Sequence, residues 1–215
     1  MKYVDWHPTK DMLATCSRDK NIMVWEIDQL EFEILEILTK HTQDVKMVKW
    51  VPDSDYELAS ASYDDTVILW DMDTDQYYPK QQLTDHASTV WSIAFVHGNR
   101  YMLTASDDLT IKVYTRQPNE TYAFSLNITG LHERCIYSLS SSSLCPGLVA
   151  SGAGDDTLCL FAIKEPTTTD EPLAYQLVER RPQAHTSDIN GVQFHPHLRL
   201  LASCGDDGDV RLWKY

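Results

Sequence analysis

The sequence has no excess of basic residues, no long apolar run and no closely spaced cysteine pair. Its 18 lysines and arginines stand against 32 aspartates and glutamates, which gives a net charge of -14. Such a charge opposes nonspecific binding to polyanions, so we expect neither nucleic acid nor a membrane as a partner. No apolar run approaches the roughly 18 residues that read as a membrane span, and the N-terminus lacks the order of a signal peptide. We therefore expect an intracellular protein.

The five cysteines are scattered along the chain, and none forms a Cys-x-x-Cys motif. This arrangement indicates free thiols in a reducing compartment. It also lacks the ligand spacing of a zinc or iron-sulfur site. We predict no metal site and no cofactor.

What the sequence does contain is a repeat of one hydroxyl residue, one aspartate and one aromatic residue. The aspartate lies six residues before the aromatic residue, and the hydroxyl residue ten before it. A histidine precedes four of the five aspartates by 22 or 23 residues, at His41, His86, His132 and His185. The five sets are Thr15, Asp19 and Trp25; Ser60, Asp64 and Trp70; Thr104, Asp108 and Tyr114; Ser151, Asp155 and Phe161; and Ser203, Asp207 and Trp213.

The aromatic residues follow one another at intervals of 44 to 52 residues. This period is typical of the blades of a WD-repeat β-propeller, each built from four short antiparallel strands. We predict an all-β fold in which residues 1–215 form one propeller domain. The expected blades cover about residues 1–40, 41–85, 86–130, 131–184 and 185–215. In the second blade we expect strands at 45–50, 58–62, 67–70 and 77–83.

The recurring polar residues have a structural interpretation. A chain of hydrogen bonds from indole to hydroxyl to imidazole to carboxylate satisfies buried polar groups and ties the turns of a blade together. The same residue types form the catalytic triad of hydrolases, but a triad occurs once, and these sets recur. We predict a structural role and no catalytic residues. Cys16 and Cys204 share a position that holds Ala61, Ala105 or Gly152 in the other repeats, so we expect both to be core thiols.

The repeat offsets place Met1 inside the first strand of the first blade and Tyr215 inside the third strand of the last blade. We therefore expect four blades of four strands and a last blade of three. If the chain is complete, exposed strand edges would favour self-association. A compact closure of the five blades is the alternative.

Particular strings go beyond the general repeat. They are residues 13–20 with 24–26, 41–46, 60–67, 88–92, and 202–204 with 206–208 and 213–215. Together they resemble the WD-repeat subunit of the cytosolic iron-sulfur protein assembly machinery, over nearly all of residues 2–215. That family has seven blades, so the chain resembles its last five.

The resemblance implies a non-catalytic scaffold in the cytosol and the nucleus. Its partners would be the other subunits of the iron-sulfur targeting complex and the recipient apoproteins. One string departs from the family. Where many members have Leu-Tyr-Arg, a motif associated with cochaperone recruitment, this chain has Leu69, Trp70 and Asp71.

The residues at the rim of the propeller channel are the candidate protein-binding residues. They lie just before each turn aspartate, or three or five residues after each histidine. Aromatic and arginine side chains at such positions often dominate binding energy, and acidic ones can complement a basic partner. Alternatively, Arg18 forms a surface ion pair with a neighbour such as Asp64, and the acidic residues form a solvated face. The candidates are Arg18, Tyr63, Trp91, Asp107, Tyr137, Asp206, Lys46, Asp44 and Asp188.

Two other functions remain open. The chain could be another WD-repeat adaptor, such as a ubiquitin-ligase substrate receptor or a histone-tail reader. It could also be a propeller enzyme, which would require a unique polar cluster in the channel. The sequence offers only repeated clusters, which favours an adaptor.

Overall fold

The computed structural model describes residues 1–29, 31–168 and 171–215. Every regular element in these ranges is a β-strand, so the fold is all-β, and the strands form five successive antiparallel sheets. No helix in the described part of the chain is long and apolar enough to cross a membrane. The chain divides into two compact units, Met1–Ile93 and Ala94–Tyr215.

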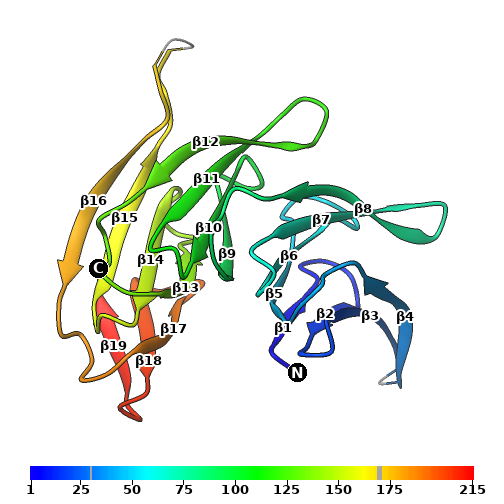
Figure 1. The fold of residues 1–215 in the computed structure, drawn as a ribbon, viewed down its shortest axis with the longest axis horizontal. Coiled ribbons are helices and arrows are strands. Elements are labelled where there is room, and N and C mark those ends of the chain that lie inside the picture. Colours follow the sequence, from blue (N-terminus) through cyan, green and yellow to red (C-terminus); the bar gives the residue numbers. More distant parts are fainter. Residues whose placement is uncertain (30, 169–170) are drawn as a thin grey trace. The chain divides into compact units, whose positions relative to one another are not determined.

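The first unit contains blades one and two (Figure 1). Both sheets are meanders, in which each strand pairs with the next one along the chain. Blade one consists of β1 (Tyr3–Trp6), β2 (Met12–Cys16), β3 (Asn21–Asp28) and β4 (Glu31–Thr39). Blade two consists of β5 (Val45–Trp50), β6 (Leu58–Ser62), β7 (Val67–Asp73) and β8 (Gln76–Leu83).

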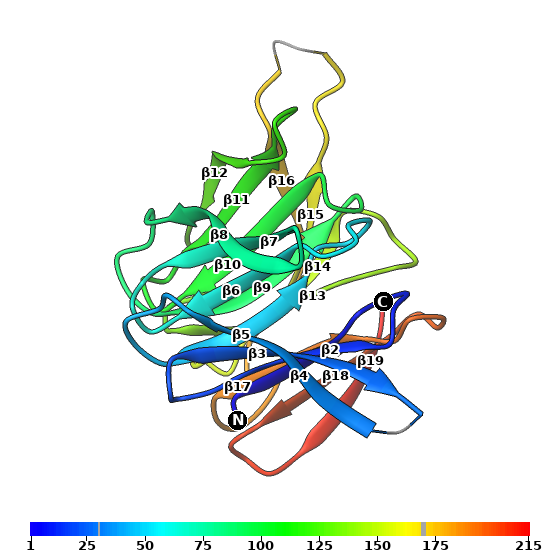
Figure 2. The same ribbon diagram turned by 90° about the vertical axis from the view of Figure 1, so that its right-hand side faces the viewer.

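The second unit contains most of blade three and all of blades four and five (Figure 2). The boundary falls inside β9, the first strand of blade three. The three sheets contain β9 (Val90–Val96), β10 (Tyr101–Ser106), β11 (Ile111–Arg116) and β12 (Tyr122–Ile128); β13 (Ile136–Ser141), β14 (Leu148–Ala153), β15 (Leu158–Lys164) and β16 (Ala174–Arg181); and β17 (Ile189–Phe194), β18 (Leu200–Gly205) and β19 (Val210–Lys214).

The strands agree closely with the sequence prediction. Blade two has its first two strands at the expected residues, while β7 runs three residues further than expected, to Asp73. Four sheets have four strands and the last has three, as the repeat offsets predict. Alternating apolar residues explain these boundaries, because successive side chains of a strand point to opposite faces of the sheet.

The core of the first unit lies between its two sheets. Blade one contributes one face, including Ala14, Ile22 and Val24, which are fully buried. Blade two contributes Leu58 and Ile68 to the same cluster, together with the ring of Trp70. Full burial of a large aliphatic side chain stabilises the fold by about 1.5–3 kcal/mol. This packing holds the turns at the ends of both blades in place.

In the second unit, blade four packs against blade five. Ala150, Leu158 and Leu160 of blade four share a buried cluster with Ile189 and Leu201 of blade five. The sheets approach so closely that a Cβ atom added to Gly152 would lie 2.6 Å from Cγ2 of Ile189. Glycine at this position is therefore a packing requirement.

The prediction that both repeat cysteines are core thiols is half wrong. Cys16 is buried, with 1% of its surface exposed, but Cys204 is exposed. Cys204 pairs with Val210, which is 72% exposed, on the face of the last sheet that points away from blade four. Sequence position alone does not distinguish the two cysteines, because exposure depends on which sheet covers that face.

The five recurring aspartates lie in the turns between the second and third strands of the blades. In each turn the carboxylate accepts a hydrogen bond, 3.0–3.2 Å long, from the backbone N–H two residues later. The residue between the two has a positive φ in all five turns, from 58° to 79°. These residues are Lys20, Asp65, Leu109, Asp156 and Gly208. A side-chain acceptor of this kind stabilises a turn in the left-handed conformation, so the aspartate fixes the shape of the turn.

Candidate protein-interaction surface

The chain of hydrogen bonds expected from the sequence is complete in blade two. Trp70 Nε1 donates to Ser60 Oγ at 2.9 Å, and Ser60 Oγ lies 2.7 Å from His41 Nε2. His41 Nδ1 lies 2.9 Å from Asp64 Oδ2, which also accepts from the backbone N–H of Thr42 at 2.8 Å. An indole N–H can only donate and an ionised carboxylate can only accept, so Trp70 donates to Ser60 Oγ and His41 Nδ1–H donates to Asp64. In the neutral imidazole the other nitrogen, Nε2, is then the acceptor of the Ser60 hydroxyl.

Blade five has the same chain of contacts. Trp213 Nε1 donates to Ser203 Oγ at 2.8 Å, and His185 lies 2.7 Å from that oxygen. The other ring nitrogen of His185 lies 2.9 Å from Asp207 Oδ1. The backbone N–H of Thr186 donates to the same carboxylate at 2.9 Å.

The other blades have shorter versions. Blade four joins Ser151, His132 and Asp155 with contacts of 2.7 and 3.1 Å, but Phe161 has no donor to add. Blade one lacks the histidine, and its contact runs from Trp25 Nε1 to Thr15 Oγ1 at 3.0 Å. Asp19 there accepts from its own turn. In blade three, His86, Thr104 and Tyr114 are buried, and Asp108 accepts from the Thr110 hydroxyl at 2.7 Å.

These contacts shift the acidity of the carboxyl groups. Burial alone would raise the pKa of Asp64, but hydrogen bonds from His41, Thr66 and Thr42 outweigh it and hold the pKa below the ordinary value. Burial opposes the shift at Asp155 as well, where the His132 ring and backbone N–H groups lower the pKa. At Asp207 the Thr186 N–H and the His185 ring have the same effect. All three carboxylates therefore stay ionised as structural acceptors.

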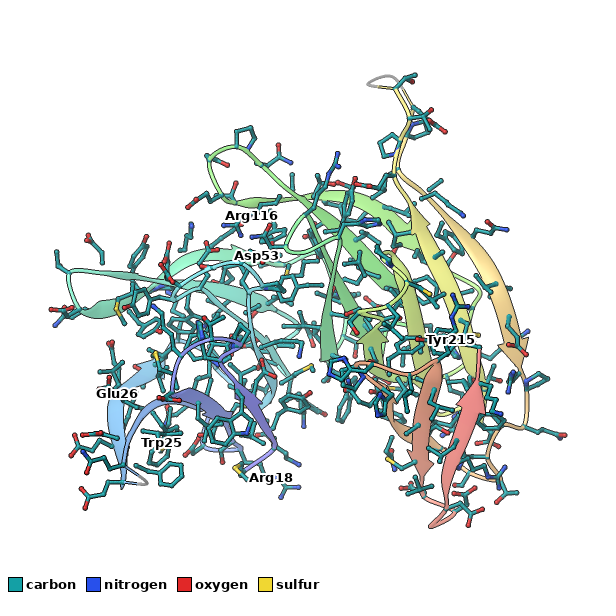
Figure 3. The ribbon with its side chains drawn as sticks, turned by 180° about the vertical axis from the view of Figure 1, so that it is seen from behind. Arg18, Trp25, Glu26, Asp53, Arg116 and Tyr215 are labelled. Carbon is teal, nitrogen blue, oxygen red and sulfur yellow. The ribbon has the colours of Figure 1, made fainter. Side chains whose placement is uncertain are left out.

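Five candidate binding residues lie together in the first unit, and we call them the lysine-aromatic cluster. Its centre is Lys46, whose Nζ lies 4.9 Å from the ring centroid of Tyr63 and 4.8 Å from that of Trp91. Asp44 Oδ2 lies 3.6 Å from Lys46 Nζ and 3.8 Å from Arg18 Nε. Arg18 projects from the turn between β2 and β3 (Figure 3). The sequence places these residues in three different repeats, and the fold brings them together.

The cluster has a fixed centre and an exposed margin. The Lys46 side chain is only 9% exposed, and burial lowers its pKa despite the opposing effect of Asp44. In contrast, the Arg18 side chain is 77% exposed and Tyr63 is 49% exposed. A cation held against aromatic faces keeps both rings in position, which reduces the entropy that a binding partner must overcome.

Arg18 forms its ion pair with Asp44 and not with Asp64. Asp64 is occupied by His41 and by the turn, so it is not available to a neighbouring guanidinium. The contact of Asp44 with two cations also means that this acidic residue is partly neutralised within the chain. Asp44 thus holds Arg18 and Lys46 in place within the lysine-aromatic cluster, and we do not count it as a separate contact for a partner.

The remaining candidates lie in the second unit and are Tyr137, Asp188, Asp206 and Asp107. We call these four residues, together with Arg134, the tyrosine-aspartate cluster. Asp188 accepts from the Tyr137 hydroxyl at 3.4 Å and pairs with Arg134 at 3.2 Å. The backbone N–H of Asp206 donates to the Asp188 carbonyl at 3.0 Å.

Asp107 lies beside Cys135 in the same unit. Burial and the neighbouring Asp107 carboxylate raise the pKa of the Cys135 thiol well above its ordinary value. The thiol is therefore neutral, and Asp107 itself is exposed.

Sequence reasoning missed Arg134. This residue also donates to the Gly154 carbonyl at 2.6 Å, so it connects two turns of the cluster. It lies two residues after His132, where the other repeats have Gln43, Ser88 and Ser187. Because the position varies in chemistry between repeats, the repeat pattern gives no signal for it.

Comparison with known proteins identifies the family of these repeats. Residues 2–26, 32–71, 77–115 and 178–214 match the family described as "WD domain, G-beta repeat". The chain belongs to the WD-repeat family. The match leaves out residues 116–177, which include most of blade four with its Phe161, yet that blade keeps the contact of His132 with Ser151. The serine, histidine and aspartate sets recur within the chain, in blades two, four and five, which agrees with a structural role in the repeat.

Several curated proteins are similar to parts of the chain. A sea anemone protein from Nematostella vectensis, named "Probable cytosolic iron-sulfur protein assembly protein CIAO1 homolog", is 40% identical over 91 residues, 41% of this chain and 27% of that protein. A mosquito protein from Aedes aegypti, named "Probable cytosolic iron-sulfur protein assembly protein Ciao1", is 38% identical over 131 residues, 55% of this chain and 38% of that protein. "Protein CIA1" of Arabidopsis thaliana is 41% identical over 103 residues, 46% of this chain and 28% of that protein.

The aligned parts thus cover no more than 38% of the length of these relatives. The aligned parts are 91 to 131 residues long, which is shorter than residues 2–215, the range over which the sequence resembles the iron-sulfur assembly family.

Proposed function

We propose that the chain is a non-catalytic scaffold in cytosolic iron-sulfur protein assembly. It would hold subunits of the targeting complex and present recipient apoproteins for cluster insertion. The observation that supports this role most strongly is the identity of 38–40% with two animal proteins that are named for that process. The proposed location is the cytosol, with the nucleus as a second site where clients are matured.

The lysine-aromatic cluster is the proposed contact surface for these partners. It combines exposed arginine and tyrosine side chains with a buried lysine that fixes the aromatic rings. Arginine, tyrosine and tryptophan are the residue types that most often dominate binding energy. The tyrosine-aspartate cluster is proposed as a second contact surface, in which the exposed acidic side chains of Asp107 and Asp206 would complement basic groups of a partner.

Affinity capture tests the role. The intact chain, tagged at one end, is used to recover proteins from a cytosolic extract, which are identified by mass spectrometry. We expect iron-sulfur targeting subunits together with iron-sulfur apoproteins. Recovery of cullin-ligase components or histones without any of these proteins would favour another WD-repeat adaptor, and our proposal would then be wrong.

Variants test the surface. Trp91→Ala combined with Lys46→Ala removes the centre of the lysine-aromatic cluster, and we expect at least tenfold less of the targeting subunits in the captured material, as at a binding hot spot. Lys40→Ala is the matched control, because this exposed lysine belongs to the same unit and takes part in neither cluster. Equal recovery with the double variant and the control would exclude this surface.

A further inference from the structure

A groove of about 730 Å³ lies in the first unit, and its lining shares no residue with the lysine-aromatic cluster. Residues from β2 to β4 of blade one line it, together with Tyr56 and Met72 of blade two. Glu26, which lines the groove, is the neighbour of Trp25 on β3 (Figure 3). Six carboxylates surround the groove: Asp11, Glu26, Asp28, Glu31, Glu33 and Asp75.

The negative charge of the groove is not neutralised by the chain itself. Within the described ranges, none of these six carboxylates forms an ion pair with a lysine, arginine or histidine. The one basic residue in the groove, Lys10, is already engaged, since its Nζ lies 3.4 Å from Asp55 Oδ1 and 3.4 Å from the ring centroid of Tyr56. Carboxylates gathered around a concave surface strengthen the local negative potential, which attracts cations.

The groove also has an apolar part. Met12, Ile27 and Met72 are partly or fully covered, whereas Leu35 is 43% exposed and Tyr56 is 37% exposed. A site for a small hydrated cation does not need exposed apolar side chains. A peptide with apolar side chains gains binding energy from covering them.

The strand that borders the groove is an edge strand. β4 is the last strand of its sheet, and it carries Phe32 and Ile34 with 56% and 49% of their surfaces exposed. Glu31 and Glu33 alternate with these apolar residues. An extended peptide can pair with such an edge through its backbone, and its side chains then alternate between two faces.

We propose that this groove and the β4 edge bind an extended segment of a partner protein in which basic and apolar residues alternate. The basic side chains would lie against the carboxylates, and the apolar ones would cover Leu35 and Tyr56. The proposal adds a third binding site to the two surfaces of the proposed function and does not depend on the lysine-aromatic cluster.

Fluorescence anisotropy with labelled peptides and the intact chain tests the proposal. The first probe is an eight-residue peptide in which lysine alternates with valine. A lysine-serine peptide has the same charge without apolar groups, a glutamate-valine peptide reverses the charge, and spermine serves as a competing small polycation. We expect the lysine-valine peptide to bind at least about tenfold more tightly than the lysine-serine peptide, with no binding of the glutamate-valine peptide. Absent binding of the lysine-valine peptide, or complete displacement by spermine at equal concentration, would overturn the proposal.

Two double variants locate the site. Glu31→Gln with Glu33→Gln should weaken binding of the lysine-valine peptide about fivefold, because two exposed charge contacts are lost. Asp65→Asn with Asp156→Asn changes the net charge equally outside the groove, at positive-φ positions that asparagine tolerates. This control should bind like the unmodified chain. An equal loss in both variants would indicate a general charge effect and contradict the site.

The surface variant of the proposed function separates the two sites. The chain with Lys46→Ala and Trp91→Ala should keep its full affinity for the lysine-valine peptide. Loss of peptide binding in that variant would place the peptide on the lysine-aromatic cluster and remove the case for the groove.

Discussion

At the scale of single residues, the serine hydroxyl is the centre of each polar chain. Ser60 is fully buried, and its oxygen contacts both the donor of Trp70 and the ring of His41. The hydroxyl can satisfy both because it accepts one hydrogen bond and donates another. Its loss would leave two buried polar groups without this partner.

Replacing Ser60 therefore gives a direct prediction. Ser60→Ala should lower the free energy of unfolding by about 1–3 kcal/mol, because the Trp70 indole and the His41 ring lose their shared partner. Urea denaturation followed by fluorescence measures the change. Ser125→Ala is the control, since that hydroxyl is exposed, and it should change stability by less than about 0.5 kcal/mol. If the two variants are equally stable, the hydroxyl has no structural role.

The low pKa values of Asp64, Asp155 and Asp207 predict a dependence of stability on pH. Because these values are lower in the folded chain than in the unfolded chain, the unfolded chain binds more protons in acid. Their stabilisation is complete above the ordinary aspartate pKa of about 4 and is lost as pH falls below it.

Urea denaturation at pH 7 and pH 3 measures this effect. The variant with Asp64→Asn, Asp155→Asn and Asp207→Asn should lose much less stability between the two pH values than the unmodified chain. Parallel losses in the two proteins would show that other groups cause the acid sensitivity.

At the scale of strands and blades, the repeat pattern predicted most of the fold and little of the packing between sheets. Alternation of apolar residues determines each strand, so β5 and β6 appear where the sequence predicts them. Which face of a strand becomes covered depends on the neighbouring blade, and for that reason Cys16 and Cys204 differ in exposure despite their equivalent positions.

Gly152 illustrates the difference between pattern and packing. The other repeats have alanine or cysteine at its position, so the sequence suggests that Gly152→Ala is harmless. In the structure the added Cβ would lie 2.6 Å from Ile189 Cγ2. We predict a loss of about 1–3 kcal/mol in the free energy of unfolding, as for other overpacked cores.

A double-mutant cycle checks the cause of this loss. In a chain that already carries Ile189→Ala, the obstructing methyl group is absent, and Gly152→Ala should cost far less. Urea denaturation of the four proteins gives the coupling energy. Additive effects of the two substitutions would mean that the contact does not explain the glycine.

The candidate binding residues show a similar limit of prediction. Their repeat positions place Arg18, Lys46 and Trp91 on one expected rim, and in the structure ion pairs with Asp44 and a cation–ring contact connect these three residues. The partners within each cluster were not predictable. Arg134 pairs with Asp188 through a side chain whose position the repeat does not specify, and the acidic groove combines residues from two blades.

At the scale of the whole molecule, polar chains inside the blades support the turns, and the exposed clusters remain for binding. The same residue types that form a catalytic triad in other folds are occupied here by structural contacts in blades two, four and five. We assign the proposed role in iron-sulfur protein assembly to the exposed clusters.

The most direct test of this role is the incorporation of radioactive iron into cytosolic iron-sulfur apoproteins. Incorporation is compared in cells that lack the chain, in cells that express it, and in cells that express it with Lys46→Ala and Trp91→Ala. Our account predicts that incorporation falls without the chain, returns with the unmodified chain and stays low with the double variant. Undiminished incorporation in cells that lack the chain would contradict it.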